Sequence, residues 1–325
     1  MTKHISFYSI LSLLTCLILM FLASCERTDI LDTPKKTSNE LNTWQEENDK
    51  HIPNVEQLLG NIKVVEGKLA FLDENHFMNV MKHLEQAVEL HNEKFESENP
   101  NLSPEELDER EDQIGFNPVQ PLLDFEQRFN FSSRREFIEE KIVKWLDNEI
   151  LDDENDPDDL DMLEEEERTL LNARGEVIIQ GTLRNLIEET QDEESRSGSC
   201  YRVKAQSQYY YYGESGNRRF KMKVSARKVP VVSYASIKTK VIHYKKRGNR
   251  WKRRRAQIEV RIQGEFHDIN CSYQRSGANS RGPKNRRRLF TLYVHNTTLF
   301  VHRFQNGKVR GTAIVNGVTR SITLN

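Results

Sequence analysis

The stretch that decides the fold class of this chain is QNGKVRGTAIVNGVTRSITL, residues 305–324. Two Asn-Gly pairs, at 306–307 and 316–317, separate runs in which apolar and polar residues alternate. Both residues of such a pair accept the positive φ of a tight hairpin turn, so the pattern is a strong local hairpin signal. It predicts a three-stranded meander over Thr298–Gln305, Lys308–Val315 and Val318–Leu324.

Similar turn signals continue upstream. Gly213–Asn217 and Gly248-Asn249 each lie between two runs with strand-like alternation. About eight strands in a row indicate a sandwich or barrel, so the sequence predicts an antiparallel all-β domain over residues 200–325. Its other expected strands are Tyr201–Tyr212, Arg218–Lys228, Ser236–Arg247 and Arg250–Gly264, with a loop over Ser272–Asn285.

The preceding half of the chain has helical periodicity instead. Between Asp73 and Glu96 apolar residues recur at the spacing of one helix face. Ser103-Pro104 and Ser133 each begin a further helix, because a glutamate three residues after each serine completes a capping box. Val64–Leu72 reads as a short hairpin that turns at Glu66-Gly67. The fold class predicted is therefore α+β: a helical N-terminal region followed by an antiparallel β-domain.

Charge divides along the same boundary. Residues 26–198 hold 46 acidic and 18 basic residues, a net charge of −28, whereas residues 199–325 hold 29 basic and four acidic residues, a net charge of +25. A near-neutral chain thus contains two strongly charged halves. Such asymmetry indicates either an anionic partner for the basic half or attraction between the halves themselves.

The acidic run Asp152–Glu167 invites comparison with a calcium-binding EF-hand loop. With Asp153 in the first position, however, Pro157 falls in the fifth and Asp158 replaces the glycine that the sharp turn requires. We therefore expect no metal site here. The run is predicted to be a solvated linker that leads into a helix through Leu160, Leu163, Leu170 and Leu171.

The first 25 residues read as a targeting segment. Lys3 precedes an apolar stretch from Ile5 to Phe21, which leads into Leu22-Ala23-Ser24-Cys25. This tetrapeptide resembles the lipobox of bacterial lipoproteins, which implies cleavage before Cys25, lipidation of that residue and attachment to a membrane. The alternative is an uncleaved membrane helix, since the apolar run approaches the roughly 20 residues that span a bilayer.

Five segments follow from these signals. They are a signal peptide at 1–24, a lipidated tether at 25–53, a mainly helical acidic domain at 54–172, a connecting strand and acidic linker at 173–199, and the basic β-domain at 200–325.

A family resemblance covers the acidic half and the lipobox. The segment LLNARGEVIIQG at 170–181, the acidic NDPDD at 155–159 and the strand GKLAF at 67–71 are similar to uncharacterised lipoproteins of the Bacteroidetes. The resemblance implies a lipid-anchored protein of the bacterial outer membrane. It implies no activity, because these motifs are structural.

Two cysteines remain in the folded part once Cys16 leaves with the signal and Cys25 is lipidated. Cys200 and Cys271 can form one disulfide in an oxidising compartment, which would contribute about 2–4 kcal/mol. The alternative is a pair of free thiols.

Strand alternation predicts where the basic residues lie. Lys221, Lys223 and Arg227 fall on the face opposite the apolar residues of their strand, which we expect to be exposed. With Trp251 and the tyrosines of 209–212 available for stacking, this face would form a groove for an anionic polymer such as an acidic glycan. The predicted anion-binding residues are Lys245, Lys246, Arg247, Arg250, Trp251, Lys252, Arg253, Arg254, Arg255, Arg286, Arg287 and Arg288.

Docking between the two halves, and simple solvation of charged strand faces, are the competing explanations for the same residues. The sequence does not fix the oligomeric state.

Signals for catalysis are weak in this sequence. It contains no nucleophile elbow, HExxH helix, phosphate loop or dinucleotide fingerprint. His243, His267, His295 and His302 are expected to be strand or loop residues rather than catalytic bases, and we expect no cofactor. The function predicted is a noncatalytic, membrane-anchored binding module. The alternatives are a structural lipoprotein whose halves dock on each other and, less favoured, an enzyme with a site between the two domains.

Overall fold

The computed structural model describes residues 55–148, 151, 153–191, 200–201, 203–213, 216–229, 234–268, 270–296 and 303–325. Within them the chain is a mixed α+β protein whose C-terminal part is rich in antiparallel strands. Pro53–Asn325 clusters as one compact unit. The predicted signal peptide and tether with Cys25, the linker at 192–199 and His302 lie outside the described residues.

Helices of the acidic half begin at side-chain caps, of which Ser103 and Ser133 are predicted by the sequence and Asp73 is found in the structure. The Asp73 side chain accepts a hydrogen bond from the amide of His76 at the start of α4 (Glu74–Ser97). Ser103 and Glu106 complete a capping box at α5 (Pro104–Ile114), and Ser133 caps α7 (Arg134–Leu146). The other α-helices of the described residues are α3 (Val55–Gly60), α6 (Gln120–Phe129), α8 (Glu165–Thr169) and α9 (Leu186–Gln191).

A small mixed sheet completes the helical half. The predicted hairpin is confirmed as β1 (Lys63–Val65) and β2 (Lys68–Phe71), which are joined by a turn with φ of 50° at Glu66 and 70° at Gly67. β3 (Glu176–Ile179) runs parallel to β2 and pairs with β4 (Thr182–Asn185). Apolar residues of this sheet, among them Leu69 and Phe71, share one core with residues from the helices.

The basic half contains two large antiparallel sheets. One has the strand order β12-β8-β7-β6, with β9 paired to β8, and the other has the order β11-β10-β14-β15. The strands are β6 (Lys204–Tyr212), β7 (Arg218–Val229), β8 (Tyr234–Arg247), β9 (Arg250–Arg253), β10 (Ala256–His267), β11 (Tyr273–Arg286), β12 (Arg288–Asn296), β14 (Val309–Val315) and β15 (Val318–Leu324).

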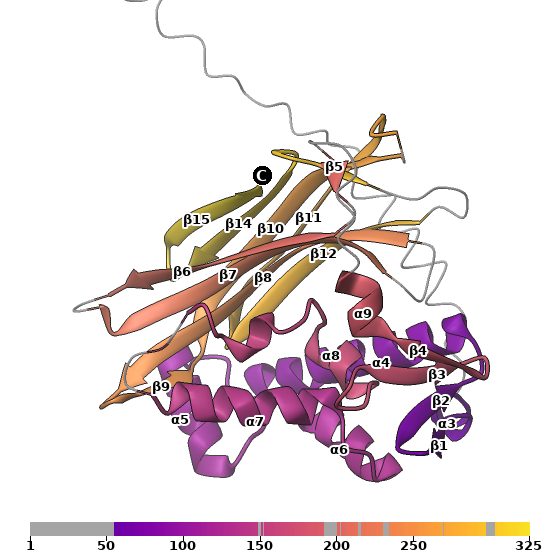
Figure 1. The fold of residues 1–325 in the computed structure, drawn as a ribbon. Helices are drawn as coiled ribbons and strands as arrows, with labels where there is room; N and C mark the ends of the chain where they lie inside the picture. The colour runs from indigo at the N-terminus through magenta and orange to yellow at the C-terminus, as the bar shows by residue number, and fades with distance from the viewer. Residues whose placement is uncertain are drawn as a thin grey trace, which may run out of the picture. The chain divides into compact units, whose positions relative to one another are not determined.

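The two sheets pack on each other through their apolar faces. Phe220, Met222 and Val224 of β7 belong to the same buried cluster as Ile258 and Val260 of β10. Alternation along β7 and β10 therefore places every second residue of these strands in this core, as the sequence predicts. The intervening residues of β7 and β8 lie on the other face of their sheet, and that face adjoins the helical half (Figure 1).

Three predictions about the strands are wrong. The expected loop Ser272–Asn285 belongs to β11, which pairs with β10 over most of its length. The expected continuous strand Arg250–Gly264 is interrupted at Arg254 and Arg255, where the chain leaves the sheet of β8 and enters the sheet of β14. Within the described part of Thr298–Gln305, β13 (Phe304–Gln305) pairs with β5 (Cys200–Tyr201) rather than with the meander.

A disulfide joins Cys200 and Cys271, whose Cα atoms are 6.1 Å apart. It connects β5 to the turn that precedes β11. Among the described helices, none has the length and apolar character needed to cross a bilayer.

Candidate functional site

Most of the acidic run between Asp153 and Glu167 lies in the interior of the protein, although Glu154 is exposed and Asp153 and Asp159 are half-buried. A 3-10 turn, η1 (Pro157–Asp159), begins where the Asp156 carboxylate accepts a hydrogen bond from the amide of Asp158, and α8 follows. Asp156, Asp158 and Asp161 are buried, and so are all four glutamates from Glu164 to Glu167. The prediction of a solvated linker is therefore wrong.

The facing surface is the basic side of β7 and β8. Lys221, Lys223 and Arg227 of β7, and Lys238 and Lys240 of β8, are all buried. The sequence correctly placed the β7 cations opposite the apolar face, but the expectation that this face is exposed is wrong. The acidic segment covers it, and an ammonium or guanidinium group can be buried there because a carboxylate lies within reach of each.

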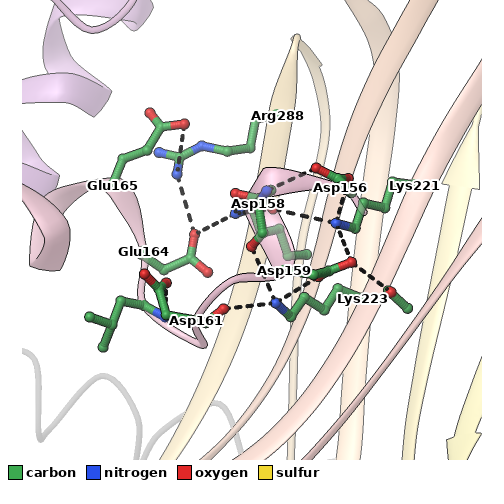
Figure 2. Close-up of polar contacts among 12 residues, drawn as sticks. Asp156, Asp158, Asp159, Asp161, Glu164, Glu165, Lys221, Lys223 and Arg288 are labelled. Atoms are coloured by element: carbon green, nitrogen blue, oxygen red, sulfur yellow. Dashed lines mark hydrogen bonds and ion pairs between the residues drawn. The ribbon is translucent and has the colours of Figure 1, made fainter. Parts of the chain in front are cut away.

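Asp158 lies at the centre of this ionic layer, which we define as the acidic segment 153–167 together with the cations that face it (Figure 2). Its carboxylate is 2.9 Å from Arg168 and 3.0 Å from Lys240, and it is 3.9 Å from Lys221. The side chains of Asp158 and Arg168 are each only 1% exposed. Burial alone would raise the pKa of Asp158, but these cations and Lys223 hold it well below its ordinary value.

Bridging lysines extend the layer along β7. Lys221 lies 2.7 Å from both Asp156 and Asp159, and Lys223 lies 2.9 Å from Asp159 (Figure 2). These contacts join neighbouring acids through shared cations, which offsets the repulsion between carboxylates that are close in sequence.

Glu164 extends the layer toward β8 and β12. It is 2.6 Å from Lys238, and Arg288 of β12 lies 3.2 Å from Glu164 and 2.9 Å from Glu166. Although burial opposes ionisation, Lys238, Lys240 and Arg288 hold the pKa of Glu164 far below its ordinary value.

The helical half is attached to the same layer through Arg168 and Arg134. Arg168 donates hydrogen bonds to Asp158 and, at 2.7 and 2.9 Å, to Asp161. Asp161 also accepts a hydrogen bond of 2.5 Å from Arg134 at the start of α7. Two buried aspartates thus connect helices α7 and α8 to the strands of the other half.

A second ionic cluster forms where the chain passes from β9 to β10. The amide of Arg255 donates to both oxygens of Asp108 in α5, and its guanidinium lies 2.5 Å from Glu111 and 2.8 Å from Glu96. Arg254 lies 3.0 Å from Asp112. Burial raises the pKa of Asp108 to about 6 against the opposing effect of the nearby arginines.

Two further arginines join this second cluster. Arg286 pairs with Glu96, and Arg287 pairs with Glu111.

The aromatic residues expected to stack on a ligand enclose an arginine of the chain itself. The guanidinium carbon of Arg219 lies 4.3 Å from the ring centre of Tyr209 and 5.0 Å from that of Trp251. Trp145, Tyr211 and Tyr244 complete the cage at 5.3 to 5.7 Å. Such cation–π contacts stabilise a desolvated guanidinium. Trp251 is buried, so its ring is not available to an external ligand.

The structure divides the twelve residues that we predicted to bind anions. Arg253, Arg254, Arg255, Arg286, Arg287 and Arg288 form ion pairs with carboxylates of the helical half, and Trp251 is buried beside Arg219. The other five form the tip of the β8–β9 hairpin: Lys245, Lys246, Arg247, Arg250 and Lys252.

An open cavity of about 670 Å³ lies beside the edge strand β6. Its lining includes Asp153, Asp159 and Lys223, and these side chains are already paired, Asp153 with Arg219 and Asp159 with Lys223. Carboxylates held in this way are poorly suited to act as an acid and base pair. The described residues contain no cluster of histidine, cysteine and acidic side chains that could hold a metal ion.

His243, one of the four histidines of the basic half that we expected to be non-catalytic, is buried and has a hydrogen-bond partner on each ring nitrogen. Its ring is buried between the hydroxyl of Tyr212, at 2.7 Å, and the carbonyl oxygen of Arg254, at 2.8 Å. Burial lowers its pKa to about 4. His267 is also buried, while the side chains of His295 and His302 lie outside the described residues.

Comparisons with known proteins give little further information on this chain. No family model matches it, and no curated protein matches it significantly. It is similar to a solved structure of a DUF4848 family protein from Bacteroides thetaiotaomicron, with 11% sequence identity and a TM-score of 0.22 over 81% of this chain and 100% of the other. This likeness assigns neither an activity nor a ligand, and it points to no enzyme family.

Replacing Asp158 by asparagine tests the centre of the ionic layer. The variant keeps the shape of the side chain but leaves buried Arg168 and Lys240 without their shared carboxylate. We expect the free energy of unfolding in urea to fall by about 3–5 kcal/mol.

The control is Asp147→Asn, which removes a carboxylate 3.6 Å from Arg250 where both side chains are more than half exposed. It should cause no measurable change. Equal effects of the two substitutions would contradict a central role for Asp158.

Glu85 should make stability depend on pH. Burial, together with the negative charges of Glu166, Glu167 and Glu164, raises its pKa from 4.5 to about 8. A carboxyl with a raised pKa stabilises the fold fully below its unfolded value and loses that contribution as the pH rises through the folded value. We therefore expect Glu85→Gln to raise the free energy of unfolding at about pH 9 and to flatten its decline between about pH 5 and 9.

Urea titrations across that range measure the effect, with the exposed Glu140→Gln as the control. If Glu85→Gln followed the profile of the unchanged protein, Glu85 would not be the group responsible.

Proposed function

We propose that the chain is a noncatalytic bacterial lipoprotein, tethered to the outer membrane through Cys25, whose acidic and basic halves dock on each other to form one body. The lipobox at Leu22–Cys25 supports the tether. The single observation that carries the docking is the contact at Asp158. There a buried carboxylate of the acidic half meets Lys240 of the basic half, and both side chains are at most 3% exposed.

Intramolecular docking accounts for the charge asymmetry better than a wide anion-binding groove does. An external polyanion would have to displace carboxylates that belong to the same chain and are therefore present at a high effective concentration. It would also have to replace the contacts of Lys240 and Lys221 without leaving a buried charge unpaired, which costs several kcal/mol. An external anion could therefore bind only to those basic residues that the docked acidic half leaves uncovered.

The noncatalytic assignment rests on how the reactive groups are used. The carboxylates of the cavity beside β6 are paired with Arg219 and Lys223. His243 is buried between two hydrogen-bonding partners, and its pKa is too low for it to be a base poised near neutral pH. These groups form ion pairs and hydrogen bonds within the fold, which favours an interaction module over an enzyme.

Docking through the ionic layer predicts that the two halves unfold together. Hydrogen exchange read by mass spectrometry along a urea series reports peptides from α4 and α5 separately from peptides of β7 and β8. All of them should lose protection at the same urea midpoint. If one half unfolded alone, the ion-paired side chains of the other half would lose their partners, which would destabilise that half as well. Midpoints that separate the helical peptides from the strand peptides would contradict docking as the organising contact.

Cys25 provides the test of the tether. In a bacterial host, Cys25→Ser removes the thiol that accepts the lipid. We expect the unchanged protein to sediment with the membranes and the variant to be released without detergent. Cys16→Ser, within the same apolar stretch, is the matched control and should leave the protein in the membrane fraction. Because the uncleaved apolar segment could itself hold the variant in the membrane, incorporation of labelled palmitate is measured as well, and labelling of the Cys25→Ser protein at the level of the unchanged protein would rule out lipid anchoring at this residue.

A further inference from the structure

The tip of the β8–β9 hairpin gathers cations on one face. Lys245 and Arg247 are two residues apart in β8, and they pair directly with Lys252 and Arg250 of β9. Alternation therefore directs these four side chains to the same side of the hairpin. Arg218 of β7 is the partner of Lys245 on its other side, so the row continues onto a third strand. We call these five residues the hairpin patch.

Facing cations of this kind destabilise a sheet unless something compensates them. Like charges directly opposite each other on paired strands repel. In the ionic layer carboxylates pair with the strand cations, but Lys245, Arg247 and Lys252 have no carboxylate of the described residues within ion-pairing distance. The other two members of the patch have partly exposed partners: Arg218 lies 3.0 Å from Glu105, and Arg250 lies 3.6 Å from Asp147. Arg247 and Lys252 are exposed, and Lys245 is half-buried. Three residues of the hairpin patch, Lys245, Arg247 and Lys252, thus belong to the predicted anion-binding set and are left unpaired by docking.

We propose that the hairpin patch binds a linear anionic polysaccharide, an inference that rests on the proposed role as a noncatalytic, membrane-anchored protein. Facing strand residues are about 5 Å apart and alternate residues along one strand about 7 Å, so the patch offers closely spaced cations on a flat surface. A polymer that carries repeated carboxylate or sulfate groups places several negative charges over this area at once. Its binding would relieve the repulsion between the facing cations.

The surroundings of the patch favour a single polymer chain over a membrane surface. Helices α5 and α7 flank the hairpin and present partly exposed acids, among them Glu105, Asp112 and Asp147. A planar anionic bilayer would be brought against these acids, whereas a narrow chain can contact the patch alone. The turn at Gly248-Asn249 also offers no apolar side chain for insertion, and Trp251 is buried.

Nucleic acid is a poorer fit than polysaccharide. Proteins that bind single strands without sequence preference combine cations with aromatic rings on which the bases stack. In this hairpin Trp251 is buried, and Tyr209 and Tyr244 are engaged around Arg219. Sugar carboxylates and sulfates require only the cations.

The experiment uses the chain from Glu26 to its end and two triple variants with the same change in charge. The hairpin variant is Lys245→Ser, Arg247→Ser and Lys252→Ser. The control variant is Arg261→Ser, Arg310→Ser and Arg320→Ser, which removes three exposed cations from the other sheet. Binding to heparin, to polygalacturonate, to vesicles that contain phosphatidylglycerol and to oligothymidylate is measured between about 0.05 and 0.5 M salt.

We expect the unchanged chain and the control variant to bind at least one of the two polysaccharides at low salt, with affinity that falls steeply as salt rises. The hairpin variant should bind about tenfold or more weakly than the control and with a shallower salt dependence. Absence of polysaccharide binding, equal losses in both variants, or tighter binding to vesicles or oligothymidylate would overturn the proposal. Cooperative unfolding and membrane attachment would be unaffected by that outcome, so the proposed function would stand or fall separately.

Discussion

The architecture depends on the pairing of buried charges across the boundary between the two halves. A carboxylate or ammonium group removed from water is stable only if oppositely charged and hydrogen-bonding groups surround it. Asp158 meets this requirement with Arg168 from its own half and with Lys240 and Lys221 from the sheet. Neither half can supply these partners alone, because almost all the acids are in one half and the other is rich in cations. The buried charges of each half are therefore neutralised by charged side chains of the other half.

This constraint explains an unusual property of strands β7 and β8. One side of these strands is apolar and packs against the second sheet, while the other side is basic and packs against the acidic segment. Both sides are buried, yet the sequence alternates as if one side faced water. The chain thereby has two kinds of interior, one held by the hydrophobic effect and one by ion pairs. The end of β8, with the start of β9, extends beyond this cover. There Lys245, Arg247 and Lys252 have no carboxylate of the described residues within ion-pairing distance, and Arg250 has only the exposed Asp147, at 3.6 Å.

Local signals predicted local structure, and their failures have physical reasons. Helix caps at Asp73, Ser103 and Ser133 and the turn at Glu66-Gly67 depend on neighbours in the sequence, so they could be found without tertiary information. The segment 272–285 is rich in serine, asparagine and glycine and forms a strand only because β10 pairs with it. The acids of 152–167 read as solvated because the strand cations that pair with them lie more than 50 residues away in the sequence. A comparison of the basic stripe of β7 with this acidic run could have suggested the contact but could not have decided between a partner within the chain and an external one.

Lysine labelling tests most directly whether the basic face of the sheet is covered. Brief treatment of the native protein with an amine-specific acetylating reagent, followed by peptide mass spectrometry, compares lysines that are close in sequence but differ in burial. If the acidic segment covers the basic face, Lys245, Lys246 and Lys252 react readily. The four lysines of the ionic layer are then protected until the protein unfolds: Lys221, Lys223, Lys238 and Lys240. Acetylation of these four at the rate of the hairpin lysines would show an open basic face and contradict the account.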